Sequence, residues 1–136
     1  MQLKKWFLIC KTYKKSNNIM RVIKSFGWAF NGLKDCILHE KNFRIQYILA
    51  LLVVIAGIFF SLSPTEWMII LLSFAMVLSF EIINSAIEKL CDLVSPDFNL
   101  TIKKVKDMSA SAVLLSAIIS FIIGCIIFLP KIFVLL

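Results

Sequence analysis

Five polar residues recur at helical spacing near the middle of this 136-residue chain. They follow the pattern i, i+3, i+4, i+7 and i+11, which places them on one face of a helix: Glu81, Asn84, Ser85, Glu88 and Asp92. An ionisable group within an apolar helix is expensive to keep and is a functional candidate by default. Glu88 lies about 10 Å beyond Glu81 along a helix axis, a separation that suits two carboxylates with different roles.

Other chemically capable residues flank the apolar parts of the chain. Glu40 precedes one such part, and Lys106 and Asp107 precede another. Carboxylates at the water boundary suit Mg²⁺, which takes one or two of them together with phosphate oxygens and water, and a lysine beside them suits phosphate. With four glycines in the chain, neither a Walker A motif nor a kinase Gly-rich loop is present.

From these residues alone, three interpretations stay open. The first is phosphoryl transfer at a nucleotide site facing the cytoplasm. The second is a proton or ion pathway through the membrane. The third is that the polar residues only seal a helix–helix interface by hydrogen bonds in lipid.

The amino-acid composition indicates whether these residues lie in water or in a lipid bilayer. Hydrophobic residues make up 60% of the chain and the mean hydropathy is +0.92, whereas soluble domains contain about 45–50% apolar residues. A soluble chain of this length could not bury that surplus. We therefore expect an all-α integral membrane protein with a single membrane domain, residues 19–136.

Three apolar segments are long enough to cross a bilayer as helices. They are residues 45–62, 67–90 and 108–129. Ser63-Pro64-Thr65-Glu66 is predicted to form a turn, with Pro64 early in the following helix. Residues 91–107 are predicted to form a polar, basic connection.

The region before the first span has a different pattern. Residues 19–44 carry apolar side chains at helical spacing with polar residues between them, which predicts an amphipathic helix lying in the membrane interface. Residues 1–18 are a basic N-terminal extension, to which we assign no function.

The positive charge is unevenly placed. Fifteen Lys and Arg against eight Asp and Glu give a net charge of +7, and the basic residues gather in residues 1–44 and 89–106. This placement favours anionic lipid headgroups over nucleic acid as the partner. The positive-inside rule puts the N-terminus and the 91–107 connection in the cytoplasm.

Three ordered motifs resemble the bacterial diacylglycerol kinase and undecaprenol kinase family, small three-span lipid kinases. The stretch 81–92 resembles the signature of the family, 106–113 resembles its second motif, and 21–34 with 40–44 resembles its N-terminal part. The resemblance covers roughly residues 20–130. The chain departs from the family pattern at Asn99, Val105 and Ser109.

The resemblance implies an ATP-dependent lipid kinase of the bacterial cytoplasmic (inner) membrane. The γ-phosphate of ATP would pass to the primary hydroxyl of diacylglycerol, giving phosphatidic acid, or of undecaprenol, giving undecaprenyl phosphate. Family members look like homotrimers with shared sites. The alternative function is a non-enzymatic membrane scaffold or a proton- or ion-conducting oligomer.

The resemblance also implies roles for individual residues. Glu81 would be the general base, in contact with the lipid, and Asn84 would orient the base or the substrate. Glu40 and Glu88 would hold Mg²⁺ against the ATP phosphates. The residues implied to contact the nucleotide are Arg21, Trp28, Lys106 and Asp107. The residues implied to contact the lipid are Phe43 and Arg44. Asp92 is left open between a metal ligand, a helix cap and a partner for Lys103.

Overall fold

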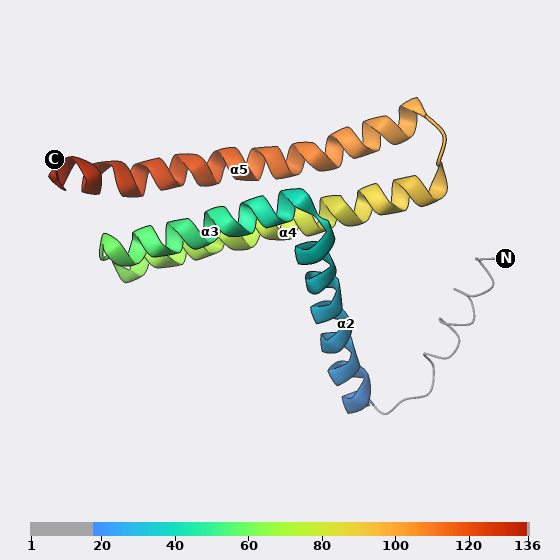
Figure 1. Cartoon of the computed structure of the whole chain (residues 1–136), viewed down its shortest axis with the longest axis horizontal. Coiled ribbons are helices and arrows are strands. Elements are labelled where there is room, and N and C mark those ends of the chain that lie inside the picture. The colour runs from blue at the N-terminus through green and yellow to red at the C-terminus, as the bar shows by residue number, and fades with distance from the viewer. Residues whose placement is uncertain (1–17, 136) are drawn as a thin grey trace. The chain divides into compact units, whose positions relative to one another are not determined.

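The computed structural model describes the backbone of residues 18–135 and the side chains of residue 20 and residues 22–134. Four helices follow one another along the described chain, with no strand in it: α2 (Asn18–His39), α3 (Lys41–Phe59), α4 (Pro64–Val94) and α5 (Leu100–Leu135) (Figure 1). The last three are long and apolar enough to cross a membrane. The predicted all-α membrane class with three spans is confirmed, while the proposed 1–18 extension falls almost wholly outside the described residues.

The chain divides into two compact units between Asp35 and Cys36. Within the first unit, helix α2 keeps the amphipathic pattern expected from the sequence. Its large apolar side chains are exposed, namely Val22, Ile23, Phe26, Phe30 and Leu33. An exposed apolar stripe on a basic helix is the pattern of a segment that lies in the lipid–water interface.

The boundary between the amphipathic helix and the first span lies earlier than expected. Helix α2 ends at His39, and Glu40 has extended backbone (φ −96°, ψ 111°) as the N-cap of α3. Glu40 therefore begins the first span, and Phe43 and Arg44 lie in its first turn. The apolar pattern did not mark this break because the residues on both sides of it are helical.

The connection between α3 and α4 is built by residues 60–63. Ser61 has a positive φ of 50° there. Ser63 and Glu66 form a capping box, since Ser63 Oγ accepts from the Glu66 N–H at 3.3 Å and Glu66 Oε2 accepts from the Ser63 N–H at 2.7 Å. The segment predicted as a turn is thus the cap and first turn of α4, with Pro64 at its start.

The connection between α4 and α5 is shorter than the predicted 91–107 segment, because only residues 95–99 lie between the two helices. Asn99 caps α5: its Oδ1 accepts from the backbone N–H groups of Thr101 at 2.8 Å and Ile102 at 3.4 Å. Lys106 and Asp107 consequently lie inside α5 rather than at its start. Helix α5 also continues through Pro130 to Leu135.

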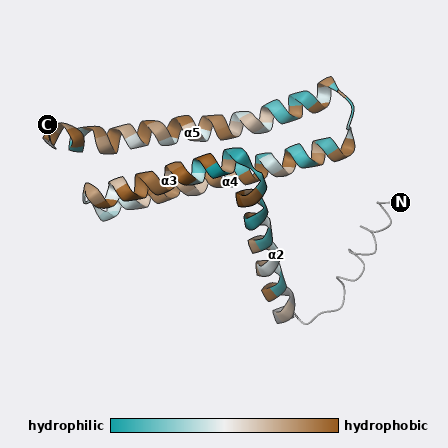
Figure 2. Ribbon diagram, viewed as in Figure 1, coloured by the Kyte–Doolittle hydropathy of each residue, from teal (hydrophilic) through white to brown (hydrophobic). Residues whose placement is uncertain are grey.

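Helix α4 contacts both α3 and α5, and it continues beyond the start of α3 towards the 95–99 loop (Figure 1). The buried apolar cluster lies towards the 60–63 connection and is centred on Leu62, Ile70 and Ile127. At the same end, Lys131 of α5 pairs with Glu66 of α4 at 3.1 Å. Hydrophilic residues gather at the opposite end, where α4 and α5 meet the 95–99 loop (Figure 2). The polar chemistry is therefore separated from the apolar packing along the helix axis.

Candidate functional site

Glu81 is the most deeply buried carboxylate of the stripe, with 3% of its surface exposed. It lies on α4, and its Oε2 accepts a hydrogen bond of 3.0 Å from Nε2 of Gln46 on α3. Burying a charged group is costly unless it is hydrogen-bonded, so this bond fixes Glu81 at the α3–α4 contact. The bond links two residues that are 35 positions apart in the chain.

Asn84 is buried one turn further along α4, with 5% of its surface exposed. Its Nδ2 donates to Glu88 Oε1 at 3.0 Å, and its Oδ1 lies 2.6 Å from Ser109 Oγ of α5. The Ser109 hydroxyl also lies 2.9 Å from the Lys106 carbonyl oxygen, so its one proton is shared between two acceptors. Both ends of the Asn84 amide are thereby oriented, one within α4 and one by α5.

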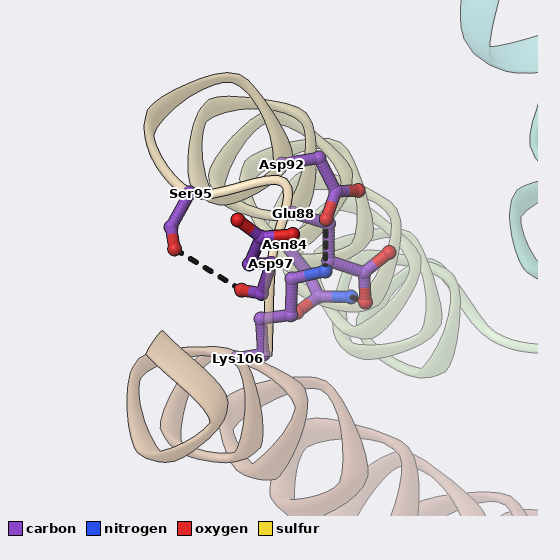
Figure 3. Close-up of polar contacts among 6 residues, drawn as sticks. All are labelled: Asn84, Glu88, Asp92, Ser95, Asp97 and Lys106. Atoms are coloured by element: carbon purple, nitrogen blue, oxygen red, sulfur yellow. Dashed lines mark hydrogen bonds and ion pairs between the residues drawn. The ribbon is translucent and has the colours of Figure 1, made fainter. Parts of the chain in front are cut away.

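Lys106 reaches from α5 to the end of the stripe on α4 (Figure 3). Its Nζ lies 2.5 Å from Asp92 Oδ1. Figure 3 shows the ammonium group beside the Asn84–Glu88 pair. Of the roles left open for Asp92, ion pairing is the one observed, and its partner is Lys106 rather than Lys103.

Glu40 is paired across helices as well. Nζ of Lys89, on α4, lies 2.8 Å from Glu40 Oε1. The Glu40 side chain is 22% exposed and that of Lys89 is 59% exposed, so the pair lies at the water boundary. An ammonium group therefore already pairs with one of the two carboxylates that were expected to hold a metal ion.

The described residues contain no group of three or more His, Cys, Asp or Glu side chains that could hold a metal ion by themselves. Glu40 and Glu88 nevertheless lie on helices in contact, α3 and α4, and Glu40 pairs with Lys89, the residue next to Glu88. Two carboxylates at the water boundary fit Mg²⁺, provided that phosphate oxygens and water complete the octahedron. The donor set therefore fits a metal that arrives with a nucleotide.

The other predicted site residues are placed as follows. Phe43 is buried, with 2% of its surface exposed, and Arg44 is exposed. Together with Ile37, Tyr47 and Ile48 they line an apolar hollow of about 210 Å³. Asp107 is exposed on α5. Trp28 is 47% exposed on α2, in the first unit, and the side chain of Arg21 lies outside the described residues.

Three contact residues were missed by the sequence analysis: Gln46, Lys89 and Ser109. Gln46 had a usable signal, since a lone amide near the start of an otherwise apolar span is unusual. Lys89 follows Glu88 directly, and Ser109 was noted only as a departure from a family pattern. Their roles depend on the packing of different helices, which periodicity within one helix does not report.

Taken together, the site offers a buried carboxylate, two further carboxylates at the water boundary and a lysine able to meet phosphate. Glu81 can accept a proton from a hydroxyl group held in the membrane. The ammonium group of Lys106 can meet the negative charge of a polyphosphate, which Glu40 and Glu88 could engage only through a shared divalent cation. This arrangement can support proton abstraction and phosphoryl transfer without a Gly-rich loop.

Comparison with known proteins agrees with this chemistry. The sequence profile of the family described as prokaryotic diacylglycerol kinase matches residues 27–128. The undecaprenol kinase of Bacillus subtilis (strain 168) is 41% identical over 115 residues, which cover 85% of this chain and 94% of that protein. The diacylglycerol kinase of Escherichia coli (strain K12) is 30% identical over 106 residues, 78% of this chain and 87% of that protein. That of Helicobacter pylori (strain J99) is 33% identical over 108 residues, 79% of this chain and 84% of that protein.

Proposed function

Because the chain belongs to the prokaryotic diacylglycerol kinase family, we propose that this ATP-dependent membrane lipid kinase uses Glu81 as its general base. The observation that carries the proposal is a carboxylate with 3% exposure that is held by an amide within a membrane-spanning helix. Family membership removes the scaffold and ion-conduction alternatives as the primary function.

The proposed reaction proceeds by direct transfer. Glu81 takes the proton of the lipid primary hydroxyl while the hydroxyl oxygen forms a bond to the γ-phosphorus of ATP. The bond from that phosphorus to the β–γ bridging oxygen breaks, and ADP leaves with its electron pair. Such transfers depend mainly on positioning and on stabilisation of charge. The Asn84 amide, fixed by Glu88 and Ser109, supplies part of that positioning.

Glu40 and Glu88 are the residues proposed to hold Mg²⁺. When bound with ATP, the ion neutralises phosphate charge during transfer. Glu40 stands at the N-cap position of α3, and Glu88 accepts a hydrogen bond from Asn84 on α4. Both carboxylates therefore come from the two helices that join at Glu81. Lys89, which pairs with Glu40 Oε1, would compete with the ion for this carboxylate.

Lys106 and Asp107 are proposed to contact the nucleotide from α5. The support for Lys106 is its ammonium group, which extends from α5 towards Glu88 and Asp92 (Figure 3). Arg21 and Trp28 are proposed, on the resemblance alone, to complete the nucleotide contacts. The departure at Asn99 does not affect this set, since Asn99 serves as the cap of α5.

We propose undecaprenol as the preferred acceptor, with diacylglycerol as the competitor. The support is that the identity to the Bacillus subtilis undecaprenol kinase is 41%, against 30% and 33% for the two diacylglycerol kinases. The lipid is proposed to enter past Phe43 and Arg44, where an apolar hollow opens beside the first turns of α3.

The proposed membrane is the bacterial cytoplasmic membrane, with the N-terminus and the 95–99 loop facing the cytoplasm. The support is the basic residues beside both, which follow the positive-inside rule, and the supply of ATP on that side. A homotrimer is proposed from the resemblance to the family.

The proposal is tested by phosphate transfer from radiolabelled ATP in detergent, with undecaprenol and diacylglycerol assayed side by side. We expect Mg²⁺-dependent labelling of lipid, with a higher kcat/KM for undecaprenol. Glu81→Gln should abolish transfer while ATP binding, measured by calorimetry, stays within about twofold. Native activity in that variant would contradict the role of Glu81, and a preference for diacylglycerol would contradict the acceptor.

A further inference from the structure

Gln46 makes a single side-chain hydrogen bond within the described residues, and that bond goes to Glu81. Its Nε2 lies 3.0 Å from Glu81 Oε2, while its own Oε1 is buried without a hydrogen-bond partner in the described chain. An unpaired buried acceptor destabilises a protein, and lipid offers no water to satisfy it. If packing were its only role, an apolar side chain of the same size would serve better at this position.

The geometry leaves one oxygen of Glu81 available. Oε2 is taken by Gln46, and Oε1 accepts no hydrogen bond from any described residue. A carboxylate that is held by one oxygen presents the other in a fixed direction. A hydroxyl group can therefore approach Oε1 without breaking the bond between Oε2 and Gln46.

The chemistry of the donor matters as much as its place. An amide donates a hydrogen bond without carrying charge, so it orients the carboxylate without neutralising it. A lysine or arginine at position 46 would form an ion pair and compete with the proton that a base must accept.

We propose that Gln46 is a positioning residue for phosphoryl transfer, whose amide directs Oε1 of Glu81 towards the lipid hydroxyl. This inference rests on the proposed function, in which Glu81 is the base. During the transfer the O–H bond of the lipid breaks and its proton goes to Glu81 Oε1, while the electron pair forms the new O–P bond. Gln46 keeps its bond to Oε2 throughout and takes no proton.

The experiment compares Gln46→Met with Gln46→His in the full-length protein. Methionine preserves the length of the side chain and removes the donor. The neutral histidine ring places an N–H at a similar reach and restores it. Leu52→Met is the control on the same helix, since Leu52 is an apolar side chain that is 56% exposed.

We expect Gln46→Met to lower kcat at least tenfold, with the KM values for ATP and lipid within about twofold of native. Gln46→His should recover kcat to within about threefold, and Leu52→Met should be unchanged. A Gln46→Met enzyme with native kcat would overturn the proposal. The proposal would also be overturned if Gln46→Met lowered kcat, raised both KM values and lowered the thermal midpoint together, because that pattern indicates damage to the fold.

The same measurements separate this inference from the proposed function. If Glu81→Gln abolishes transfer while Gln46→Met does not affect it, the base assignment stands and only the positioning role fails. If Glu81→Gln retains native activity, the proposed function fails first and the role of Gln46 fails with it.

Discussion

Nζ of Lys89 on α4 lies 2.8 Å from Oε1 of Glu40 at the start of α3. The neighbouring residue of Lys89 is Glu88, the other carboxylate proposed to hold Mg²⁺. If Glu40 holds the ion as proposed, the ammonium group of Lys89 would compete with it for that carboxylate. Since the Lys89 side chain is 59% exposed, water weakens the pair, and exposed ion pairs contribute about 0–1 kcal/mol.

Lys89→Met should remove this competition. We expect the Mg²⁺ concentration for half-maximal rate to fall up to about fivefold, the factor that corresponds to about 1 kcal/mol. The measurement is the initial rate of phosphate transfer as Mg²⁺ is titrated at saturating ATP. Lys104→Met, which changes an exposed lysine of α5, is the control and should leave the titration unchanged. A higher Mg²⁺ requirement in Lys89→Met would show that Lys89 assists the site instead.

Lys106 should matter far more to nucleotide binding than its partner Asp92. Lys106→Met removes the ammonium group proposed to meet phosphate, so we expect the KM for ATP to rise at least tenfold. Asp92→Asn loses only an ion pair whose side chains are 33% and 68% exposed, so its KM should stay within about fivefold of native. The check is ATP titration of both variants, and equal effects on KM would assign Lys106 a structural role.

Ser109→Ala should lower stability more than activity. The change removes the 2.6 Å bond to Asn84 Oδ1 but leaves the Asn84–Glu88 bond intact. Side-chain hydrogen bonds between membrane helices contribute about 0.6 kcal/mol on average and up to about 1.7 kcal/mol. The free energy of unfolding in detergent should therefore fall by that amount. We expect kcat to stay above half of native, whereas Asn84→Ala should lose most of it. A loss in Ser109→Ala as large as in Asn84→Ala would place Ser109 in the reaction.

Gly57→Ala should destabilise the end of the bundle near the 60–63 connection. A Cβ at Gly57 would lie 2.8 Å from Cη2 of Trp67 and 2.9 Å from Cδ1 of Leu62, whereas one at Gly124 meets nothing within 4 Å. Overpacking costs about 1–3 kcal/mol, and both variants gain about 1 kcal/mol of helix propensity. Thermal unfolding in detergent should therefore rank Gly57→Ala below Gly124→Ala by about 1–3 kcal/mol. Equal midpoints would mean that Trp67 moves aside freely.

The proposed orientation predicts which loop can be labelled from outside the cell. In a background with the four native cysteines changed to serine, Thr65→Cys should react with a membrane-impermeant maleimide in intact spheroplasts. Phe98→Cys, at a position 81% exposed in the 95–99 loop, should react only after the membrane is opened. The reverse pattern would invert the topology and would place the site away from cytoplasmic ATP.

The sequence was sufficient for the membrane class, the three spans and the polar stripe of α4. Hydropathy and helical spacing are properties of a single segment, so they are readable before any packing is known. Motif resemblance then predicted the family, which the comparisons confirm. Helix ends were less predictable: the break at Glu40 and the short 95–99 loop both lie within stretches whose composition suits either a helix or a connection.

Only the tertiary structure decided the partners of the polar groups. Three of these contacts join two different helices: Gln46 with Glu81, Lys89 with Glu40, and Ser109 with Asn84. Such a pairing depends on how far each helix is rotated and shifted against its neighbour, and no pattern within one helix encodes that. The stripe from Glu81 to Asp92 is thus a property of the sequence. Its division into a buried carboxylate held by an amide, an oriented amide and a lysine-bound carboxylate is a property of helix packing.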